Sequence, residues 1–388
     1  MPLRDVIIID LTRQLPGPFC TQILADFGAQ VIKIEGPDGD PIRGQGPRLH
    51  KESAYFLGVN RNKRSLVLNL KAKRGKEVFF RLAQRADVII EGFRPGVMER
   101  LGIGYTEIRK INPRIIYCSL SGYGQDGPYR NRPGHDINYI ALGGILGVTG
   151  RKNSAPVIPG GQIADLTGGL LAALGLMLGL WARQKTGRGQ YIDVAMLDGV
   201  ISWLPFYLGE YMTEDKIPKR GEMLLNGGYA CYNVYETKDG AYMTLGALEP
   251  HFWEAFCREI GREDLIPDQF AAGKRQREMI QELQKIFMQR TQQEWIKFWE
   301  EKNVPCEPVL SLEEVIYHPQ VLFRRMFVEI EHPTEGRIKQ LGIPIKLSET
   351  PGKLRTPPPL LGEHTQEILL QLGYSPQEVE ELRQEGVF

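Results

Sequence analysis

Three ionisable residues are candidates for proton-transfer chemistry because of where they lie in the chain. His135 and Asp136 come just before one Gly-rich apolar stretch, and Asp165 comes just before another. Both places are expected helix starts, where free backbone N–H groups stabilise developing negative charge. Histidine moves a proton near neutral pH, and a nearby carboxylate can move a second one. A His and an Asp facing each other across one substrate carbon would allow proton transfer on both of its faces.

Each of these residues also has a structural interpretation. His135 alone is typical of a structural histidine, and Asp165 alone is typical of a cap for a helix that begins near Leu166. Glu249, in the segment Leu245–Pro250, is a further acid that could simply start a helix. Considered singly, none of the three decides between catalysis and structure.

The composition is that of an ordinary globular protein whose positive and negative charges nearly balance. The 388 residues favour two domains, and the net charge of +1 gives no reason to expect nucleic acid or an anionic membrane as partner. Five widely spaced cysteines without metal-ligand spacing predict reduced thiols, no metal and a cytoplasmic location. The first ten residues lack a signal-peptide layout, and the uncharged run Leu166–Ala182 favours a buried helix over a membrane span.

Short apolar runs alternate with helical patterns through the first half of the chain. Strands are expected at residues 5–10, 31–35, 65–70, 88–91, 114–120 and 191–195, with helices between them. This alternation predicts an α/β fold with a doubly wound, mostly parallel, Rossmann-like sheet.

The pattern changes after residue 200, which predicts four segments. We expect a large α/β domain at 1–200, a linker at 201–228, and a smaller α+β domain at 229–310 that begins with a hairpin around Lys238–Gly240. Residues 311–388 are expected to form a linker with a helix at 312–326, an extended Pro-rich arm at 350–362, and the C-terminal part of the large domain.

Basic residues gather where strands are expected to end. The first strand–helix junction has Pro16-Gly17-Pro18 in place of GxGxxG, which argues against NAD. Cations at strand ends beside helix starts still favour a ligand that carries phosphate groups, but one other than NAD. The residues concerned are Arg43, Arg61, Lys63, Arg64, Lys71, Arg94 and Arg100.

Several long motifs together resemble the class III CoA-transferase family, of the formyl-CoA transferase and carnitine CoA-transferase type. They are Asp10–Pro18, Gly28–Glu35, Asn60–Ser65, Glu91–Gly102, Ser121–Pro128 and Thr186–Asp193. The segments Gly134–Tyr139, Gly227–Tyr232 and Gly246–Pro250 resemble the α-methylacyl-CoA racemase branch of that family.

The resemblance implies an interlocked homodimer with an acyl-CoA substrate and no cofactor beyond its CoA moiety. By the same resemblance, the residues that bind CoA are Gln14, Leu15, Pro16, Leu68, Asn69, Leu70, Lys71, Gly92, Phe93, Arg94, Arg100, Gly134 and Tyr139. Arg43 is added as a candidate because Gly36 stands where the family often has a basic residue.

The resemblance also implies roles for the ionisable residues. In the racemase branch, His135 and Asp165 would exchange the α-proton of a 2-methyl-branched acyl-CoA through an enolate held near Asp136, and Glu249 would orient His135. The alternative is a CoA-transferase in which Asp165 is a nucleophile and becomes an aspartyl-CoA thioester. We expect the racemase and keep the transferase as the second hypothesis.

Overall fold

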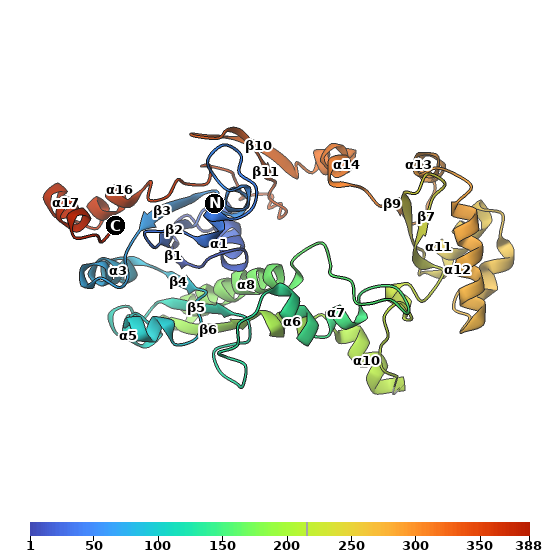
Figure 1. Cartoon of the computed structure of the whole chain (residues 1–388), viewed down its shortest axis with the longest axis horizontal. Coiled ribbons are helices and arrows are strands. Elements are labelled where there is room, and N and C mark those ends of the chain that lie inside the picture. The colour runs from blue at the N-terminus through green and yellow to red at the C-terminus, as the bar shows by residue number, and fades with distance from the viewer. Residues whose placement is uncertain (215) are drawn as a thin grey trace. The chain divides into compact units, whose positions relative to one another are not determined.

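The computed structural model describes residues 1–214 and 216–388, which form two units (Figure 1). Unit 1 contains residues 1–143, 161–202 and 319–388, and unit 2 contains residues 144–160 and 203–318. Residue 215, within the linker expected at 201–228, lies outside the described residues.

A six-stranded parallel sheet forms the centre of unit 1. Its strands are β1 (Ile7–Leu11), β2 (Gln30–Glu35), β3 (Lys63–Val67), β4 (Val88–Glu91), β5 (Ile116–Ser121) and β6 (Gln190–Ala195). Their order is β3-β2-β1-β4-β5-β6, and every neighbouring pair is parallel. The short apolar runs become strands because both faces of this sheet are covered, which confirms the predicted α/β fold with a parallel sheet.

Helices cover both faces of the sheet. On one face, α3 (Lys73–Arg85), α5 (Tyr105–Ile111), α16 (Thr365–Gln371) and α17 (Pro376–Gln384) share a buried apolar cluster with the strands. Ile9 and Leu11 of β1 point into that cluster, so Asp10 between them points to the other face. There the Thr21 hydroxyl of α1 (Pro16–Asp26) donates to Asp10 at 2.6 Å. Helix α8 (Ile163–Thr186) packs beside α1.

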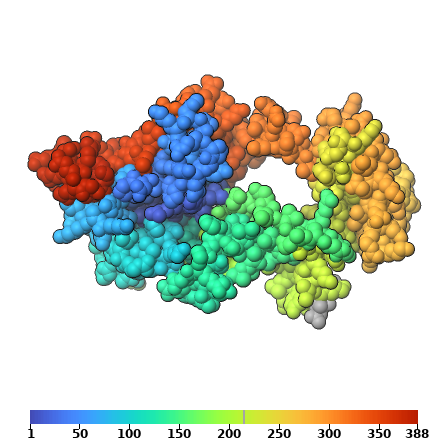
Figure 2. All heavy atoms as spheres, viewed as in Figure 1, coloured from blue at the N-terminus to red at the C-terminus, as the bar shows by residue number. Residues whose placement is uncertain are grey.

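The C-terminal segment completes unit 1 by returning to the β3 edge of the sheet. The N–H of Asn69 donates to the carbonyl of Val387 at 2.7 Å, and the N–H of Val67 donates to the Thr365 hydroxyl at 3.1 Å. Arg74 of α3 pairs with Glu385 at 2.7 Å. Figure 2 shows the red C-terminal helices directly beside the light blue residues of α3. Residues 350–362 contain no helix or strand, as expected for an extended arm.

The remaining elements of unit 1 are short. They are η1 (Pro41–Gly44), α2 (Ala54–Val59), α4 (Val97–Leu101), α6 (Asp136–Leu142), α9 (Met196–Ile201), α15 (Pro319–Phe323) and the antiparallel pair β10 (Phe327–His332) and β11 (Gly336–Leu341).

Helix α8 is less buried than the sequence predicted, because only one of its faces is covered. Among the described helices it alone has the length and composition of a membrane span, and half of its most apolar window is buried in the protein. The other face exposes an apolar stripe at helical spacing. The stripe consists of Leu170, Leu174, Met177, Leu178 and Trp181, which are 40–61% exposed.

Unit 2 is organised around a three-stranded antiparallel sheet. Its strands β7 (Tyr232–Glu236), β8 (Tyr242–Gly246) and β9 (Cys306–Pro308) pack against α11 (Pro250–Glu259), α12 (Lys274–Phe287) and α13 (Gln292–Trp299). An aromatic core that includes Trp253, Phe256, Phe287, Trp295 and Trp299 fills the space between them.

The structure adds detail to one expectation in this part of the chain and corrects another. The segment expected to be a linker at 201–228 contains α10 (Pro205–Glu214) and η2 (Leu224–Asn226). The helix expected at 312–326 is two helices, α14 (Leu312–Tyr317) and α15, because Pro319 lacks an N–H and keeps His318 in an extended conformation. Unit 2 also contains α7 (Ile145–Val148) and η3 (Glu263–Asp268).

Candidate active site

The strand order of unit 1 reverses between β1 and β4, and two loops follow these neighbouring strands. In open α/β sheets, ligands bind at such a switch point, outside the carboxyl ends of the strands. The loop after β1 carries Gln14–Pro16, and the loop after β4 carries Gly92–Arg94. The Arg13 guanidinium lies over the Phe93 ring at 4.8 Å and joins the two loops. The sheet therefore brings together two of the segments that sequence reasoning assigned to CoA.

Buried charges hold the loop after β1 in place. The Lys33 ammonium donates to the Thr12 carbonyl at 2.9 Å and pairs with Asp40 at 2.8 Å. Asp40 in turn accepts the N–H of Gln14 at 3.2 Å. Burial disfavours the charge on Lys33, but Asp10, Asp40 and other acids outweigh it and raise its pKa. Gln14 has a φ of 63°, a left-handed conformation that this network stabilises.

Two of the basic residues expected near phosphates are instead internal. Arg61 is 2% exposed and pairs with Asp26 at 2.6 Å. Lys63 is 1% exposed, pairs with Asp10 at 3.3 Å and donates to the Pro18 carbonyl at 3.0 Å. Burial lowers the pKa of Lys63 to about 8, against the opposing effect of Asp10. The interpretation of Arg61 and Lys63 as ligand-binding cations was wrong, because their charges stabilise the fold.

Arg43 is also committed to contacts within the protein. Its guanidinium bonds to both carboxylate oxygens of Glu35, at 2.7 and 2.9 Å, and to Glu52 at 3.1 Å. It also lies over the Phe56 ring at 3.5 Å. Its assignment to CoA stays a prediction, and any such contact would have to compete with this ion pair.

Three of the expected cations are free to meet a ligand. Lys71, Arg94 and Arg100 are exposed, and none of them makes an ion pair with another residue in the described part of the chain. Lys71 lies in a turn in which its N–H donates to Asn69 at 3.1 Å. Leu68, directly before that turn, belongs to the buried core, and Leu70 packs against the same core.

The segments that carry His135 and Asp165 meet through Asp136. His135 is the residue before α6, and Asp136 is its first residue. One oxygen of the Asp136 carboxylate accepts the N–H of Ala164 at 2.6 Å and the N–H of Asp165 at 3.1 Å. Asp165 therefore lies in the first turn of α8 and does not cap it; the cap is supplied by Asp136 from 28 residues away.

Asp165 has the electrostatics of a proton carrier. Its partial burial and the nearby Asp136 charge raise its pKa to about 6, while His135 acts in the opposite direction. The His135 side chain is exposed and close enough to influence this carboxyl group. A carboxyl group with this pKa both holds and releases a proton near neutral pH.

Close glycine packing fixes the first turns of α8 beside the switch point. A Cβ atom on Gly169 would lie 2.6 Å from the Pro16 carbonyl oxygen, so only glycine fits there. Tyr139 fixes the backbone before His135, since its hydroxyl donates to the Gly134 carbonyl at 2.7 Å. Burial raises the pKa of Tyr139 to about 12, so this hydroxyl remains a donor.

Glu249 lies in unit 2 as the exposed residue before α11. Its carbonyl accepts the N–H groups of Phe252 and Trp253 at 3.0 and 3.1 Å, and its side chain makes no capping bond. The pairing of Glu249 with His135 stays a prediction.

Sequence reasoning missed Glu91, a buried acid at the carboxyl end of β4. Its carboxylate accepts the N–H of Phe93 at 2.7 Å and shapes the loop that carries Arg94. Burial raises the pKa of Glu91 to about 7, although Ser119 and Phe93 favour its charged form. The available signal was an acid that ends an otherwise apolar strand just before Gly92-Phe93-Arg94.

The described residues contain no group of His, Cys, Asp or Glu side chains arranged to hold a metal ion. The five cysteines are buried and unbonded.

Comparison with known proteins gives consistent matches over nearly the whole chain. Residues 3–365 match the model of "CoA-transferase family III". Succinyl-CoA:glutarate CoA-transferase from Mus musculus is 38% identical over 100% of this chain and 90% of its own. Alpha-methylacyl-CoA racemase from Homo sapiens is 36% identical over 100% of this chain and 97% of its own. A CAIB/BAIF family protein from Brucella suis has a TM-score of 0.83 at 31% identity, covering 96% of this chain and 99% of its own.

Proposed function

The chain belongs to CoA-transferase family III, and on that premise we propose that it epimerises 2-methyl-branched acyl-CoA thioesters at the α-carbon. The observation that carries this proposal is the joining of His135 and Asp165 through the Asp136 cap. It brings an imidazole and a carboxyl group whose pKa is raised to about 6 to the starts of two neighbouring helices.

The proposed reaction is a proton exchange with no net change in composition. His135 removes the α-proton from one face, and the electron pair moves onto the thioester oxygen to give an enolate. Protonated Asp165 then returns a proton to the other face. In the described part of the chain the N–H groups of Asp136 and Ile137 have no acceptor, so they are free to stabilise the enolate oxygen. The step needs neither a metal nor a nicotinamide.

The CoA moiety is proposed to bind at the switch point of unit 1. Lys71, Arg94 and Arg100 supply exposed positive charge for its phosphates, and Gln14–Pro16 and Gly92–Phe93 supply backbone and apolar contacts. The cytoplasmic location and the absence of nucleic-acid and membrane partners stay predictions.

The second candidate is transfer of CoA between an acyl-CoA and a carboxylic acid. The specific observation in its favour is that similar proteins include both transferases and a racemase. In this reaction the Asp165 carboxylate attacks the thioester carbonyl, which forms a mixed anhydride and releases the CoA thiolate. The thiolate then attacks the aspartyl carbonyl of the anhydride, which forms an aspartyl-CoA thioester and releases the donor acid as a free carboxylate. The acceptor acid displaces that thioester in the reverse sequence of steps.

Proton NMR in deuterated water separates the two reactions. A racemase exchanges the α-hydrogen of 2-methylacyl-CoA for deuterium with that single substrate, and His135→Ala stops the exchange. A transferase needs a second carboxylic acid, and His135→Ala leaves substantial acyl exchange. Hydroxylamine added during turnover would trap an aspartyl-CoA intermediate, and mass spectrometry would detect the modified Asp165. Such a modification would establish the transferase reaction and exclude the racemase.

We also propose that the protein is a homodimer, as the resemblance implies. The support is the exposed apolar stripe of α8, which a soluble monomer would leave in contact with water.

A further inference from the structure

The loop at residues 122–135, between β5 and α6, leads directly into His135 and contains Tyr123, a residue without a role in the proposed reaction. Tyr123 packs edge to face against Tyr139 of α6, with ring centroids 5.1 Å apart and ring planes at 80°. It also packs edge to face against Tyr129 of the same loop, at 5.6 Å and 86°. Edge-to-face contacts of this kind are favourable for aromatic rings, so Tyr123 holds the loop against α6.

The backbone that carries Tyr123 is anchored on both sides. Before it in the chain, the Gly122 carbonyl accepts the N–H of Leu197 in α9 at 3.0 Å. After it, the N–H of Gln125 donates to the Asp193 carboxylate of β6 at 3.0 Å. The Tyr123 ring is therefore attached to a fixed support at the sheet.

The residue before His135 fits closely against the same rings. A Cβ atom on Gly134 would lie 2.7 Å from the Tyr139 ring and 3.0 Å from the Tyr123 hydroxyl oxygen. The Tyr139 hydroxyl also donates to the Gly134 carbonyl at 2.7 Å. A shift of either ring would therefore release the backbone to which His135 is joined.

Helix α6 fixes the His135 backbone from the other side. The N–H of His135 donates to the Asn138 side-chain oxygen at 3.0 Å, and its carbonyl accepts the N–H of Asn138 at 2.8 Å. The imidazole is exposed, so its position depends largely on this backbone. Because Tyr123 contacts both Gly134 and Tyr139, one ring supports the residue before His135 and the helix after it.

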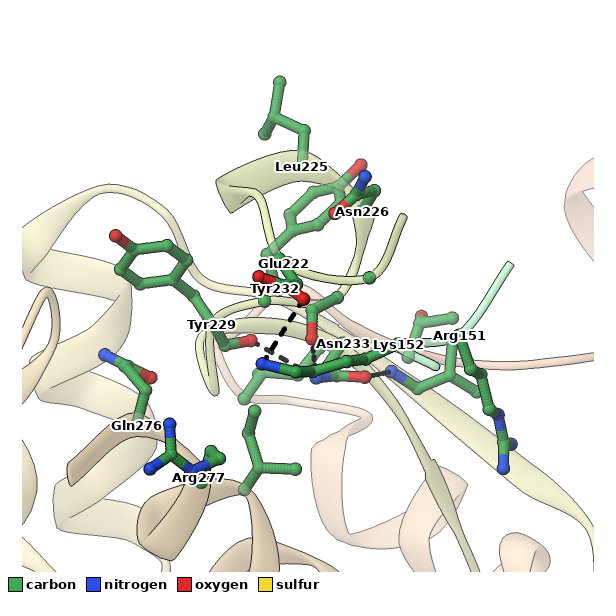
Figure 3. Close-up of a pocket in the computed structure, with 18 of the residues that line it drawn as sticks. Arg151, Lys152, Glu222, Leu225, Asn226, Tyr229, Tyr232, Asn233, Gln276 and Arg277 are labelled. Carbon is green, nitrogen blue, oxygen red and sulfur yellow. Dashed lines mark hydrogen bonds and ion pairs between the residues drawn. The ribbon is translucent and has the colours of Figure 1, made fainter. Parts of the chain in front are cut away.

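The surroundings of Tyr123 differ from those of the tyrosines in unit 2. Tyr229 and Tyr232 line a cavity of about 1090 Å³ (Figure 3). The half-buried Tyr123 ring is packed against two other rings, and the outer one, Tyr129, is covered by the Arg132 guanidinium at 3.9 Å. These contacts indicate that Tyr123 holds neighbouring parts of the chain in place.

We propose that Tyr123 is a positioning residue whose ring holds Gly134 and α6 so that the His135 imidazole reaches the α-carbon of the substrate. The inference rests on the proposed epimerisation and adds a residue to it. A catalytic base must lie within hydrogen-bond distance of the proton it removes, and a misplacement of about 1 Å can slow a reaction about 100-fold. Tyr123 acts through His135 and needs no contact with the substrate.

Tyr123→Leu tests this role because it removes both ring contacts. We expect kcat for α-deuterium exchange to fall about tenfold or more, while KM changes by less than about twofold. The reason is that the cations proposed to bind CoA lie on other loops and helices. Tyr123→Phe keeps the ring and should restore kcat to within about threefold of the unmodified protein.

Tyr105→Leu is the matched control. Tyr105 also packs against two rings, Tyr117 and Tyr191, at 5.8 and 5.4 Å. It belongs to the cluster with α3 and α5, on the face of the sheet opposite α8. This variant should lose a similar amount of packing and keep kcat, and melting curves of all three variants compare their stability.

Titration of Asp165 reports the position of His135 without a substrate. His135 lowers the pKa of Asp165, against the larger effects of burial and of Asp136. If His135 moves away in Tyr123→Leu, the pKa of Asp165 should rise above about 6, and carbon-13 NMR measures this rise. A loss of stability alone would leave this titration unchanged.

Three results would overturn the proposal. The first is an unchanged kcat or an unchanged Asp165 titration in Tyr123→Leu. The second is an equal loss of kcat in Tyr105→Leu, which would show a general loosening of unit 1. The third is an equal loss in Tyr123→Phe, which would show that ring packing is not the cause. Failure of the proposed function is distinguishable from these results, because only that failure abolishes exchange by the unmodified protein.

Discussion

At the scale of single residues, the raised pKa of Asp165 suits proton transfer and also lowers the stability of the folded protein. Its carboxyl group has a pKa of about 6 in the folded chain, against an ordinary value of 3.8. A pKa raised by folding means that the ionised form is disfavoured in the folded protein. The penalty is absent below pH 4, develops as the pH rises to about 6, and is then constant.

Asp165→Asn should therefore stabilise the protein while it abolishes turnover. At pH 8 we expect the free energy of unfolding to increase by about 1–3 kcal/mol, and at pH 4 we expect little change. Urea unfolding at the two pH values measures this. Asp126→Asn, at an exposed position, is the control and should show no such pH-dependent gain. Equal stability of Asp165→Asn and the unmodified protein at pH 8 would contradict the burial argument.

The Asp136 carboxylate has two roles that substitution can separate. It raises the pKa of Asp165 by its charge and caps α8 by accepting two N–H groups. Asp136→Asn keeps an acceptor oxygen and removes the charge, so the pKa of Asp165 should fall below 6. Carbon-13 NMR titration of the aspartate carboxyl groups measures this shift, and an unmoved Asp165 titration would argue against coupling.

Asp136→Ala provides the complementary variant because it removes the cap as well. Loss of a helix cap costs about 0.5–2 kcal/mol, so this variant should be less stable than Asp136→Asn. Identical stability of the two variants would show that the hydrogen bonds to α8 contribute nothing.

At the scale of elements, the strand order places the loops after β1 and β4 side by side, where we propose that CoA binds. Arg94 follows β4, beside the loop after β1, and its charge is exposed. We expect Arg94→Gln to weaken CoA binding about tenfold or more, since a charge-assisted hydrogen bond contributes about 1.5–3 kcal/mol. Calorimetry with CoA measures the effect.

Arg188→Gln is the matched control for Arg94. Arg188 is exposed just before β6, which places it at the amino edge of the same parallel sheet. If CoA binds at the carboxyl edge, its affinity should be unchanged in this variant. If both variants weakened CoA binding equally, the loss would reflect the overall positive charge of the protein and not a specific contact of Arg94.

The strands were predictable from the sequence because a parallel sheet buries both faces of each strand. Residues 88–91 and 116–120 show this, since each is a short, largely apolar run that becomes a fully buried strand in the structure. Short helices such as α2 and α5 were missed, because a helix of two turns has too few residues to establish a period.

The sequence could indicate candidate site residues but not the partners that their side chains contact. The types and positions of His135 and Asp165 indicated proton chemistry, but the capping of α8 by Asp136 joins residues that are 28 apart in sequence. Arg61 and Arg94 look equivalent in the sequence, yet one pairs with buried Asp26 and the other is exposed. Tertiary contact alone decides which cation is structural.

At the scale of the whole molecule, unit 1 is assembled from three separated stretches of chain. Its C-terminal stretch adds α16 and α17 to the cluster that covers one face of the sheet. The N–H of Asn69 donates to Val387 and the N–H of Val67 donates to Thr365, so hydrogen bonds join the C-terminal stretch to the β3 edge. Residues 319–388 are therefore integral to the fold of unit 1.

The apolar stripe of α8 gives the last prediction, which concerns assembly. Leu174 and Leu178 lie one turn apart on the exposed face of the helix, and each is more than half exposed. Burying a leucine side chain contributes about 1.5–3 kcal/mol, so covering the stripe with a second copy would stabilise both chains. We expect light scattering to show a dimer, and Leu174→Glu with Leu178→Glu to shift it toward monomer. Gln184→Glu, which adds a charge at an exposed polar position of the same helix, should leave the dimer intact. A folded monomer at micromolar concentration in the unmodified protein would rule out this use of the stripe.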